Sequence, residues 1–481
     1  MSALSPRWAS LAIVVLVALT ALATPPHASA TSHHPNTRPE PTLRDATCDV
    51  TITAAIDTID GEKEPFNTLA PGSVLCLEAG TRPNLRILDL HGAPDAPFLV
   101  RNEGGQVRIT GELFGDGAIS IVGSSFLRVS GAGVESHCGA AHPPDAQRCG
   151  IVIDGAVKGI KVNTSKGFVG DIELDHIEVL NVTSEKKTRG IAFHPIPGLT
   201  VSGIHVHHNH IVETLAEGIY IGSEPHNQPF ETLGKVQRVE IHHNLVERTG
   251  YDGIKVKVGI SEVSVHDNVI HDAGQLRDAA HQGGIKLALS VGDYYNNTII
   301  GGVEGIRMGR ELESPGTRYF NNLVIGASQV GIEASEDGTM IFNNTVISIA
   351  DLGIKTTGEA AYVADNIVAD TKRPILIRSG ADLRNLVVTD PAEAGFVDAA
   401  AGDYRLRNTS VAVDAGQEVS GMPCAANDAR PVRLPHTRGA VSYDHDWNAR
   451  PAGCRIDLGA FERASTPPRS RLATHLRLGL R

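Results

Sequence analysis

Three cationic side chains, Lys255, Lys286 and Arg307, occupy the same place in a short recurring pattern of glycine, isoleucine, cation and apolar residue. The three runs read DGIKV, GGIKL and EGIRM. A lysine amine that lies beside other cations has a lowered pKa and can remove a proton as a general base. An arginine beside it can stabilise negative charge as that charge develops. The pattern therefore predicts chemistry on an anionic substrate, if the fold places the three side chains together.

The element that would place them together is a repeat. The asparagines that precede the pattern are 35, 24, 29, 25, 22 and 22 residues apart, and short β-branched runs alternate with Gly and Asn. This length, with three short strands and an asparagine at one turn, is typical of one coil of a right-handed parallel β-helix. We interpret the asparagines as structural, because Asn tolerates a left-handed turn and can bond its neighbour in the next coil. They are Asn209, Asn244, Asn268, Asn297, Asn322, Asn344 and Asn366.

We predict an all-β fold, a right-handed parallel β-helix with an N-terminal cap and an irregular C-terminal closing segment. Near its start the chain has Arg7 and an apolar run, LAIVVLVALTALA, followed by ASA ending at Ala30, which is typical of a secretory signal peptide. No later stretch approaches about 18 uncharged apolar residues, so we expect an exported protein, extracellular or periplasmic, without a membrane span. The predicted divisions are a signal peptide (1–30), a disordered linker (31–44), a cap with the first coils (45–98), the parallel β-helix (99–395), the closing segment (396–463) and a disordered tail (464–481).

The cysteine content predicts disulfides, and the net charge argues against one class of partner. Six cysteines in an exported chain predict disulfides, and although fifteen pairings are formally open, short loops close at the lowest entropic cost. The net charge of −12 argues against nucleic acid as a partner. We expect a monomer. The predicted disulfide pairs are Cys48 with Cys76, Cys138 with Cys149, and Cys424 with Cys454.

Strand alternation assigns a direction to each side chain of the pattern. The isoleucines point into the coil, so the residue that follows each of them points outward, onto an exposed face. Successive coils lie about 4.8 Å apart, which puts the three cations side by side with Lys257 one step along. Like charges adjacent in a sheet are unfavourable, so the column is expected to serve an anion. The alternative is a solvated face with local counter-ions such as Asp252 and Glu304. The predicted outward residues are Tyr220, Lys255, Lys286, Arg307, Glu333 and Lys355.

Two insertions are predicted to form the walls of a groove along this column. The distance from the turn asparagine to the pattern glycine is 8 or 9 residues in most coils but 16 in the coil that holds Lys286. The additional residues, QLRDAAH, bring Arg277, Asp278 and His281 beside the lysine. A second insertion, residues 223–235, follows Tyr220. Insertions in repeat proteins often mark the binding face.

The step of 21 residues from Lys286 to Arg307, with GIRMG following YYNNTIIGG, resembles the polysaccharide lyase family that includes alginate lyases and chondroitinase B. The resemblance covers roughly residues 99–395. It implies β-elimination in an anionic, uronate-containing polysaccharide, with Lys286 as the base and Arg307 stabilising charge or protonating the leaving group. The family's calcium ligands include acidic residues shortly before the lysine, where this chain has Ala279 and His281. We therefore expect no cofactor, with calcium left open.

Without calcium, the substrate carboxylate would be neutralised by Lys255, Lys257 or His281. Tyr220 and Arg310 are predicted sugar contacts. All five are predicted substrate-binding residues.

Two other functions stay open. Paired carboxylates such as Glu217, Asp252 and Glu304 precede the pattern glycines and could serve as the acid and base of a glycosidase. However, the paired-Asp and Gly-His-Gly signatures of β-helical polygalacturonases are missing. A non-catalytic carbohydrate-binding or surface β-helix would bind anions without turnover. Histidine-rich turns (IHVHHNH, IHHN) favour structural or surface roles over metal binding.

Overall fold

The computed structural model describes residues 47–111, 116–133, 149–164, 169–183, 188–223, 229–309, 316–417, 442–451 and 455–463. All of them belong to one compact unit that spans residues 41–481. The predicted signal peptide (1–30), the linker (31–44), the tail (464–481) and Arg310 lie outside the described residues. Within the described ranges there is no helix long and apolar enough to span a membrane.

One 12-stranded parallel sheet carries the Gly-Ile pattern, each coil adding one strand. Its strands are β2 (Thr58–Asp60), β4 (Leu85–Leu88), β6 (Ile119–Val122), β9 (Ile160–Asn163), β12 (Ile191–His194), β15 (Ile219–Ile221), β18 (Ile254–Lys257), β21 (Gly283–Ala288), β24 (Glu304–Met308), β27 (Val330–Ala334), β30 (Leu352–Thr356) and β33 (Arg373–Ile377).

A 23-stranded parallel sheet forms the remaining faces, with two strands from most coils. Its strands are β1 (Val50–Ile52), β3 (Val74–Arg82), β5 (Phe98–Ile109), β7 (Ser125–Ser130), β8 (Ile151–Asp154), β10 (Gly170–Asp175), β11 (Ile177–Val182), β13 (Thr200–His207), β14 (His210–Thr214), β16 (Lys235–His242), β17 (Leu245–Glu247), β19 (Gly259–His266), β20 (Val269–His271), β22 (Asp293–Tyr295), β23 (Thr298–Ile300), β25 (Arg318–Phe320), β26 (Leu323–Ile325), β28 (Met340–Phe342), β29 (Thr345–Ile347), β31 (Ala361–Ala364), β32 (Ile367–Ala369), β34 (Gly380–Leu383) and β35 (Leu386–Val388).

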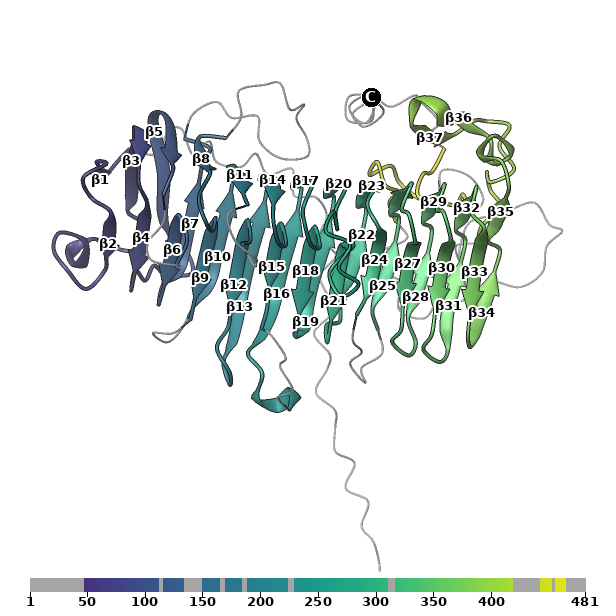
Figure 1. Cartoon of the computed structure of the whole chain (residues 1–481), viewed down its shortest axis with the longest axis horizontal. Helices are drawn as coiled ribbons and strands as arrows, with labels where there is room; N and C mark the ends of the chain where they lie inside the picture. The colour runs from purple at the N-terminus through teal and green to yellow at the C-terminus, as the bar shows by residue number, and fades with distance from the viewer. Residues whose placement is uncertain are drawn as a thin grey trace, which may run out of the picture. The chain divides into compact units, whose positions relative to one another are not determined.

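The strands stack in chain order, from purple β1 to green β35 in Figure 1, and the fold is the predicted right-handed parallel β-helix. An antiparallel pair follows the coils, and the other described elements are short 3₁₀ turns. The isoleucines of the pattern, such as Ile254 and Ile285, are completely buried in the continuous core between the sheets, as alternation predicts. The additional elements are β36 (Phe396–Asp398), β37 (Asp403–Leu406), η2 (Phe66–Thr68), η3 (Phe230–Thr232), η4 (Pro391–Ala394) and η5 (Ala399–Ala401).

The predicted asparagine ladder is confirmed. The side-chain amide of Asn297 donates to Oδ1 of Asn322 at 3.0 Å, and Asn322 donates in the same way to Asn344 at 2.9 Å. The same contact joins each ladder asparagine to the next and extends one coil beyond the predicted set, to Asn385. Each amide also donates to a backbone carbonyl of a preceding strand, for example Asn322 to Tyr294. The ladder therefore satisfies polar backbone groups at a buried turn in every coil.

The closing segment packs over the turns of the later coils. The indole nitrogen of Trp447 donates to Asp267 at 2.9 Å, and the amide of Asn321 donates to the carbonyl of Tyr443 at 2.8 Å. Of the predicted disulfides, Cys48–Cys76 is confirmed. Cys149 is also disulfide-bonded, and the Cys424–Cys454 pair lies outside the described residues.

Replacing one rung of the ladder tests its contribution. Asn322→Ala removes the four hydrogen bonds of the Asn322 side chain and leaves buried partners unsatisfied, so we expect the free energy of unfolding to fall by about 2–3 kcal/mol. Urea denaturation followed by circular dichroism measures this loss. The exposed Asn408 is the control, and Asn408→Ala is expected to change stability by less than about 0.5 kcal/mol. Equal effects of the two substitutions would contradict a structural ladder.

Candidate active site

The predicted column is present on the 12-stranded sheet. Lys255 is paired in register with Tyr220 on one side and Lys286 on the other, and Lys286 is paired with Arg307. Glu333 follows Arg307 at the next strand. Because the strands are adjacent and parallel, five consecutive coils supply these side chains at the spacing of a β-sheet.

The expectation that this face is exposed is wrong for half of the column. Lys286 is 5% exposed, Lys255 1% and Tyr220 0%. Their side chains do point away from the core, but other parts of the chain cover them. The predicted insertion after β20 is one cover, because His281 contacts the amine of Lys255 and the carbonyl of Ala280 accepts a hydrogen bond from Lys286. Strand alternation determines the direction of these side chains, and the packing of the loops determines how far they are exposed.

A second column runs beside the first, formed by the residue that precedes each pattern glycine. Backbone hydrogen bonds place Arg189, Glu217, Asp252, Gly283 and Glu304 at equivalent positions on β12 to β24 and the loops before them. In this arrangement Asp252 lies three residues before Lys255, and Glu304 lies three residues before Arg307. The predicted cationic column is thus largely neutralised by local counter-ions, as the alternative of a solvated face had anticipated for Asp252 and Glu304.

Lys255 is the centre of a buried ion network. Its amine lies 2.6 Å from Oδ2 of Asp252, 3.3 Å from Oε1 of Glu217 and 2.6 Å from Nδ1 of His281. Arg189 donates to the other oxygen of Glu217 at 2.8 Å. Burial alone would raise the pKa of Glu217, but His281, Arg189 and Lys255 hold that pKa below its usual range.

The same carboxylates and imidazole bear on the question of calcium. Glu217, Asp252 and His281 each present a ligand atom within 4.8 Å of the others, which is the spacing of a metal site. The ammonium group of Lys255, however, lies among those atoms. A divalent cation placed there would meet a buried positive charge at contact distance. The residues present therefore do not fit calcium at this position, and Lys255 supplies positive charge there.

Lys286 differs from its neighbours because Gly283 stands where Asp252 and Glu304 stand in the adjacent coils. Within the described ranges its amine has no carboxylate within 4.0 Å, and it donates to the carbonyl of Ala280 at 2.7 Å. Burial lowers the pKa of Lys286, and the charges of Lys255 and Arg307 lower it further, against an opposing effect of Asp252. From the sequence we attributed the lowered pKa of Lys286 to the neighbouring cations, but burial is the larger cause.

Arg307 lies at the more open end of the column, with 28% of its side chain exposed. It forms a hydrogen-bonded ion pair with Glu304 and lies 3.5 Å from a carboxylate oxygen of Glu333. Glu333 in turn accepts a hydrogen bond from Lys355 at 2.6 Å. Lys355 is thus connected to Arg307 through one carboxylate.

Tyr220, a predicted sugar contact, and Lys257, a predicted partner of the substrate carboxylate, are both buried. Tyr220 is fully buried, with the guanidinium carbon of Arg189 3.9 Å from the ring centroid and the His194 ring stacked at 5.2 Å. Lys257 is 8% exposed, and its amine lies 5.5 Å from the same ring. Cations on an aromatic face stabilise the packing of this part of the column. Arg189 and His194 were missed, although the run RGIAFH repeats the pattern and would have located both.

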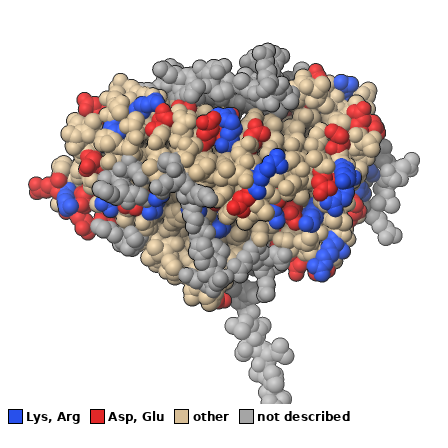
Figure 2. Space-filling view, viewed as in Figure 1, with Lys and Arg blue, Asp and Glu red and all other residues tan. Residues whose placement is uncertain are grey.

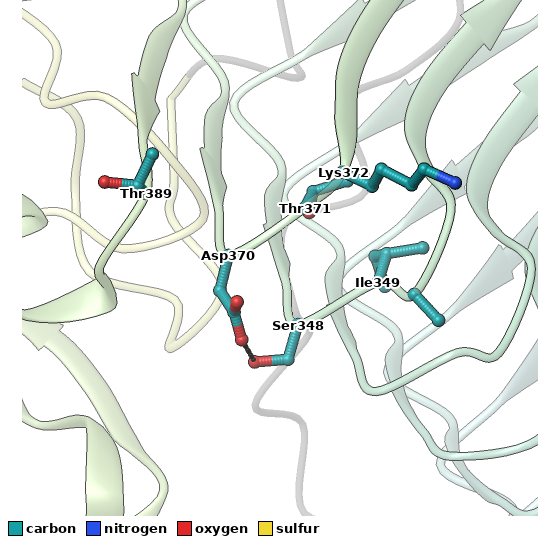
Figure 3. A pocket seen from close by; sticks show the side chains of 7 residues that line it. Ser348, Ile349, Asp370, Thr371, Lys372 and Thr389 are labelled. Carbon is teal, nitrogen blue, oxygen red and sulfur yellow. Dashed lines mark hydrogen bonds between the residues drawn. The ribbon is translucent and has the colours of Figure 1, made fainter.

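The described surface around the coils has mixed charge. On the face that Figure 2 shows, Lys and Arg side chains are interspersed with Asp and Glu. Further along the same row of loops, a hollow of about 440 Å³ follows β29, β32 and β35 (Figure 3). Ser348 donates to Asp370 at its rim, and Lys372 contributes a cation. It contains none of the predicted site residues.

Comparison with known proteins finds chains of similar structure. No family model and no curated protein matches the chain. The fold is similar to GH136 lacto-N-biosidase from Eubacterium ramulus, at 15% identity and a TM-score of 0.44, over 72% of this chain and 68% of that one. It is similar to pectate lyase Pel9A, at 13% identity and a TM-score of 0.43, over 88% and 98%.

A third similar structure is the PL6 family polysaccharide lyase Pedsa3628 from Pseudopedobacter saltans, at 13% identity and a TM-score of 0.38, over 76% of this chain and 98% of that one. At these identities the likeness concerns the β-helical fold alone. The chemistry has to be argued from the side chains of this chain.

The buried ion network predicts a pH-dependent stability. Because the pKa of Glu217 is lowered on folding, its ionised form stabilises the fold at pH values above about 4.5, and this stabilisation declines as the pH falls toward the folded pKa. We expect Glu217→Gln to cost about 3–5 kcal/mol at pH 7, since it leaves Lys255 and Arg189 short of a counter-charge.

Urea unfolding of wild type and variant at pH 7 and at about pH 3.5 measures the effect, with a smaller difference expected at the lower pH. The control is Glu213→Gln, because Glu213 forms an exposed pair with Arg248. A cost for Glu217→Gln that is the same at both pH values would argue against the network as described.

Proposed function

We propose that this protein cleaves an anionic, uronate-containing polysaccharide by β-elimination. The observation that carries the proposal is Lys286, a buried amine with a lowered pKa and no carboxylate within ion-pair distance among the described residues, next in register to Arg307. A neutral amine is what a general base requires, and a neighbouring guanidinium is what a developing carbanion requires.

In the proposed reaction, the neutral amine of Lys286 takes the C5 proton of the uronate and becomes an ammonium group. The electron pair of the C–H bond moves toward the carboxylate, forming an enolate-like intermediate that Arg307 stabilises. The pair then forms the C4–C5 double bond as the bond from C4 to the glycosidic oxygen breaks. That oxygen takes up a proton, supplied by Lys286, Arg307 or water, and the products are an unsaturated uronate and a new chain end.

The other cations are proposed to act in two ways. Arg307 and His281, each with 28% of the side chain exposed, are the groups within reach of the substrate carboxylate. Lys255 is 1% exposed, so we propose that it acts through its field and takes the place of a calcium ion. Substrate access requires the Ala280 carbonyl to release the amine of Lys286, because this hydrogen bond covers the base.

The hydrolase alternative is less well supported. A glycosidase needs one carboxylic acid that stays protonated near neutral pH. The pKa of Glu217 is below its usual range, so this carboxylate is held in the ionised form, and Asp252 is paired with the buried amine of Lys255. A non-catalytic binding protein is the other alternative, and an activity assay separates it from both enzymes.

The proposal includes export and action as a monomer on the polysaccharide, with no nucleic acid partner. The Cys48–Cys76 disulfide supports an oxidising compartment, in keeping with the signal peptide predicted for residues 1–30.

Removing the base tests the chemistry. Lys286→Met keeps the length and apolar packing of the side chain, so we expect the fold to persist and the rate to fall by at least ~10²-fold. The assay follows the far-ultraviolet absorbance of the unsaturated product on a panel of uronate polysaccharides. Reducing ends without this absorbance would indicate a hydrolase, and binding without either product a non-catalytic protein.

The control for this test is Lys161→Met. Lys161 lies in the same column on β9, but its ion pair with Asp116 is separate from the network, whereas Lys355 shares Glu333 with Arg307. Lys161→Met is expected to retain wild-type activity. Full activity in Lys286→Met would rule out the assignment of the base.

Gly283 allows a test of the missing carboxylate. A Cβ atom there would lie 3.2 Å from the carbonyl oxygen of Ile285, 3.4 Å from Cβ of Lys286 and 3.5 Å from Oδ1 of Asp252, which small adjustments can accommodate. Gly283→Asp would place a carboxylate beside Lys286 as Asp252 lies beside Lys255, and so would raise the pKa of Lys286.

Since only the neutral amine is active, kcat/KM rises with pH up to the pKa of Lys286, which lies below 10.5 in the wild type. We expect Gly283→Asp to move this rising limb to higher pH and Gly283→Asn, which has the same volume without the charge, to leave its position unchanged. Coincident profiles for the two variants would exclude Lys286 as the titrating base.

A further inference from the structure

A column of histidines occupies the turns between β13 and β14 and between β16 and β17, on the 23-stranded sheet and outside the candidate active site. Each turn contains a His-His pair, His207 with His208 and His242 with His243, directly before a ladder asparagine. The second histidine of each pair has a left-handed backbone, with φ of 52° at His208 and 54° at His243.

The two pairs lie directly above one another. His207 stacks on His242 with ring centroids 4.7 Å apart, and His208 stacks on His243 at 4.9 Å. Within each pair the rings are nearly perpendicular, at 86° and 87°. Four imidazoles are therefore held in a fixed array by the register of two adjacent coils.

Within each pair the two Nδ1 atoms face each other. The Nδ1 atoms of His207 and His208 are 2.8 Å apart, and those of His242 and His243 are also 2.8 Å apart. Only one proton can lie between two nitrogens at this distance. Two imidazole ligands in cis positions, each about 2.0–2.1 Å from a metal ion, have their nitrogens about 2.9 Å apart. Both pairs are thus already close to the spacing of a chelate.

A carboxylate orients one of the rings. Glu173 contacts Nε2 of His207 at 3.0 Å, which directs Nδ1 of that ring toward His208. Metal ions bind unprotonated nitrogens, so an ion would displace the proton between the two Nδ1 atoms of a pair.

Neither the turn nor the stack requires histidine at these places. The left-handed position is taken by His176 in the preceding coil but by Asp267 and Asn296 in the next coils. The stack passes from His242 through His266 to Tyr295 and Phe320, so other aromatic rings also serve in it. The closing segment reaches this turn column at Asp267, through Trp447. The fold does not require these histidine pairs, and their arrangement suits metal ligation. We therefore expect them to have a function other than folding.

We propose that the array His207, His208, His242 and His243 binds one transition-metal ion through paired Nδ1 atoms. Imidazole nitrogens and the Irving–Williams order favour Cu²⁺, with Ni²⁺ and Zn²⁺ weaker. The ion replaces the shared proton of a pair, and water completes its coordination. A second ion at the other pair would lie about one coil spacing away, about 5 Å, so charge repulsion limits the array to one tight equivalent.

The test uses the untagged full chain and CuCl₂. Isothermal titration is expected to give one tight equivalent of Cu²⁺ per chain, and the electron paramagnetic resonance spectrum should contain superhyperfine splitting from at least two nitrogens. The double variant His208→Asn, His243→Asn uses the residue that later coils carry at this turn, so the fold should persist. It should bind Cu²⁺ at least tenfold more weakly.

His205→Asn is the matched control, because His205 lies on the same strand, is more than 40% exposed and faces Glu240, outside the array. It should bind as the wild type does. Absence of saturable binding by the wild type, a spectrum without nitrogen splitting, or unchanged affinity in the double variant would each overturn the proposal. If the double variant fails to fold, the wild-type spectrum still decides the identity of the ligands.

Discussion

The parallel register between coils is the constraint on which every other feature of this protein depends. Each coil is hydrogen-bonded through its backbone to the coils before and after it, at a spacing of about 4.8 Å. The asparagine amides also fix one turn of each coil against the next. A side chain in this fold has little freedom in where it lies, because its neighbours are determined one coil away in both directions. The candidate active site and the histidine array are both consequences of that regularity.

Electrostatics inside the site follow from the same register. Two columns of side chains lie next to each other, and charge in one is matched by charge in the other at Asp252 with Lys255 and at Glu304 with Arg307. Buried ions require such matching, since a lone buried charge is costly. The coil with Gly283 breaks the match, and the unmatched group is the amine of Lys286, whose pKa is lowered by burial.

The features that depend on the periodicity of the chain could be predicted from the sequence. The β-helix, the asparagine ladder, the order of Tyr220, Lys255, Lys286 and Arg307 along the sheet, and the direction of their side chains all follow from spacing and alternation. Burial did not follow, because it depends on how non-repeating loops fold back over the sheet. The insertion before Lys286 was identified as a wall of the site, yet its role as a cover over Lys255 and Lys286 depends on contacts far apart in sequence.

The register between coils also allows the order of side chains on the sheet to change while the coils still stack. Because the coils repeat, gaining or losing one whole coil would leave the stacking of its neighbours intact while giving Lys286 a different partner. Gradual substitution would alter single side chains, but duplication of a coil would change the neighbours of a whole set of side chains in one step. New combinations of catalytic and binding groups can therefore arise in this fold through sequences that all still fold.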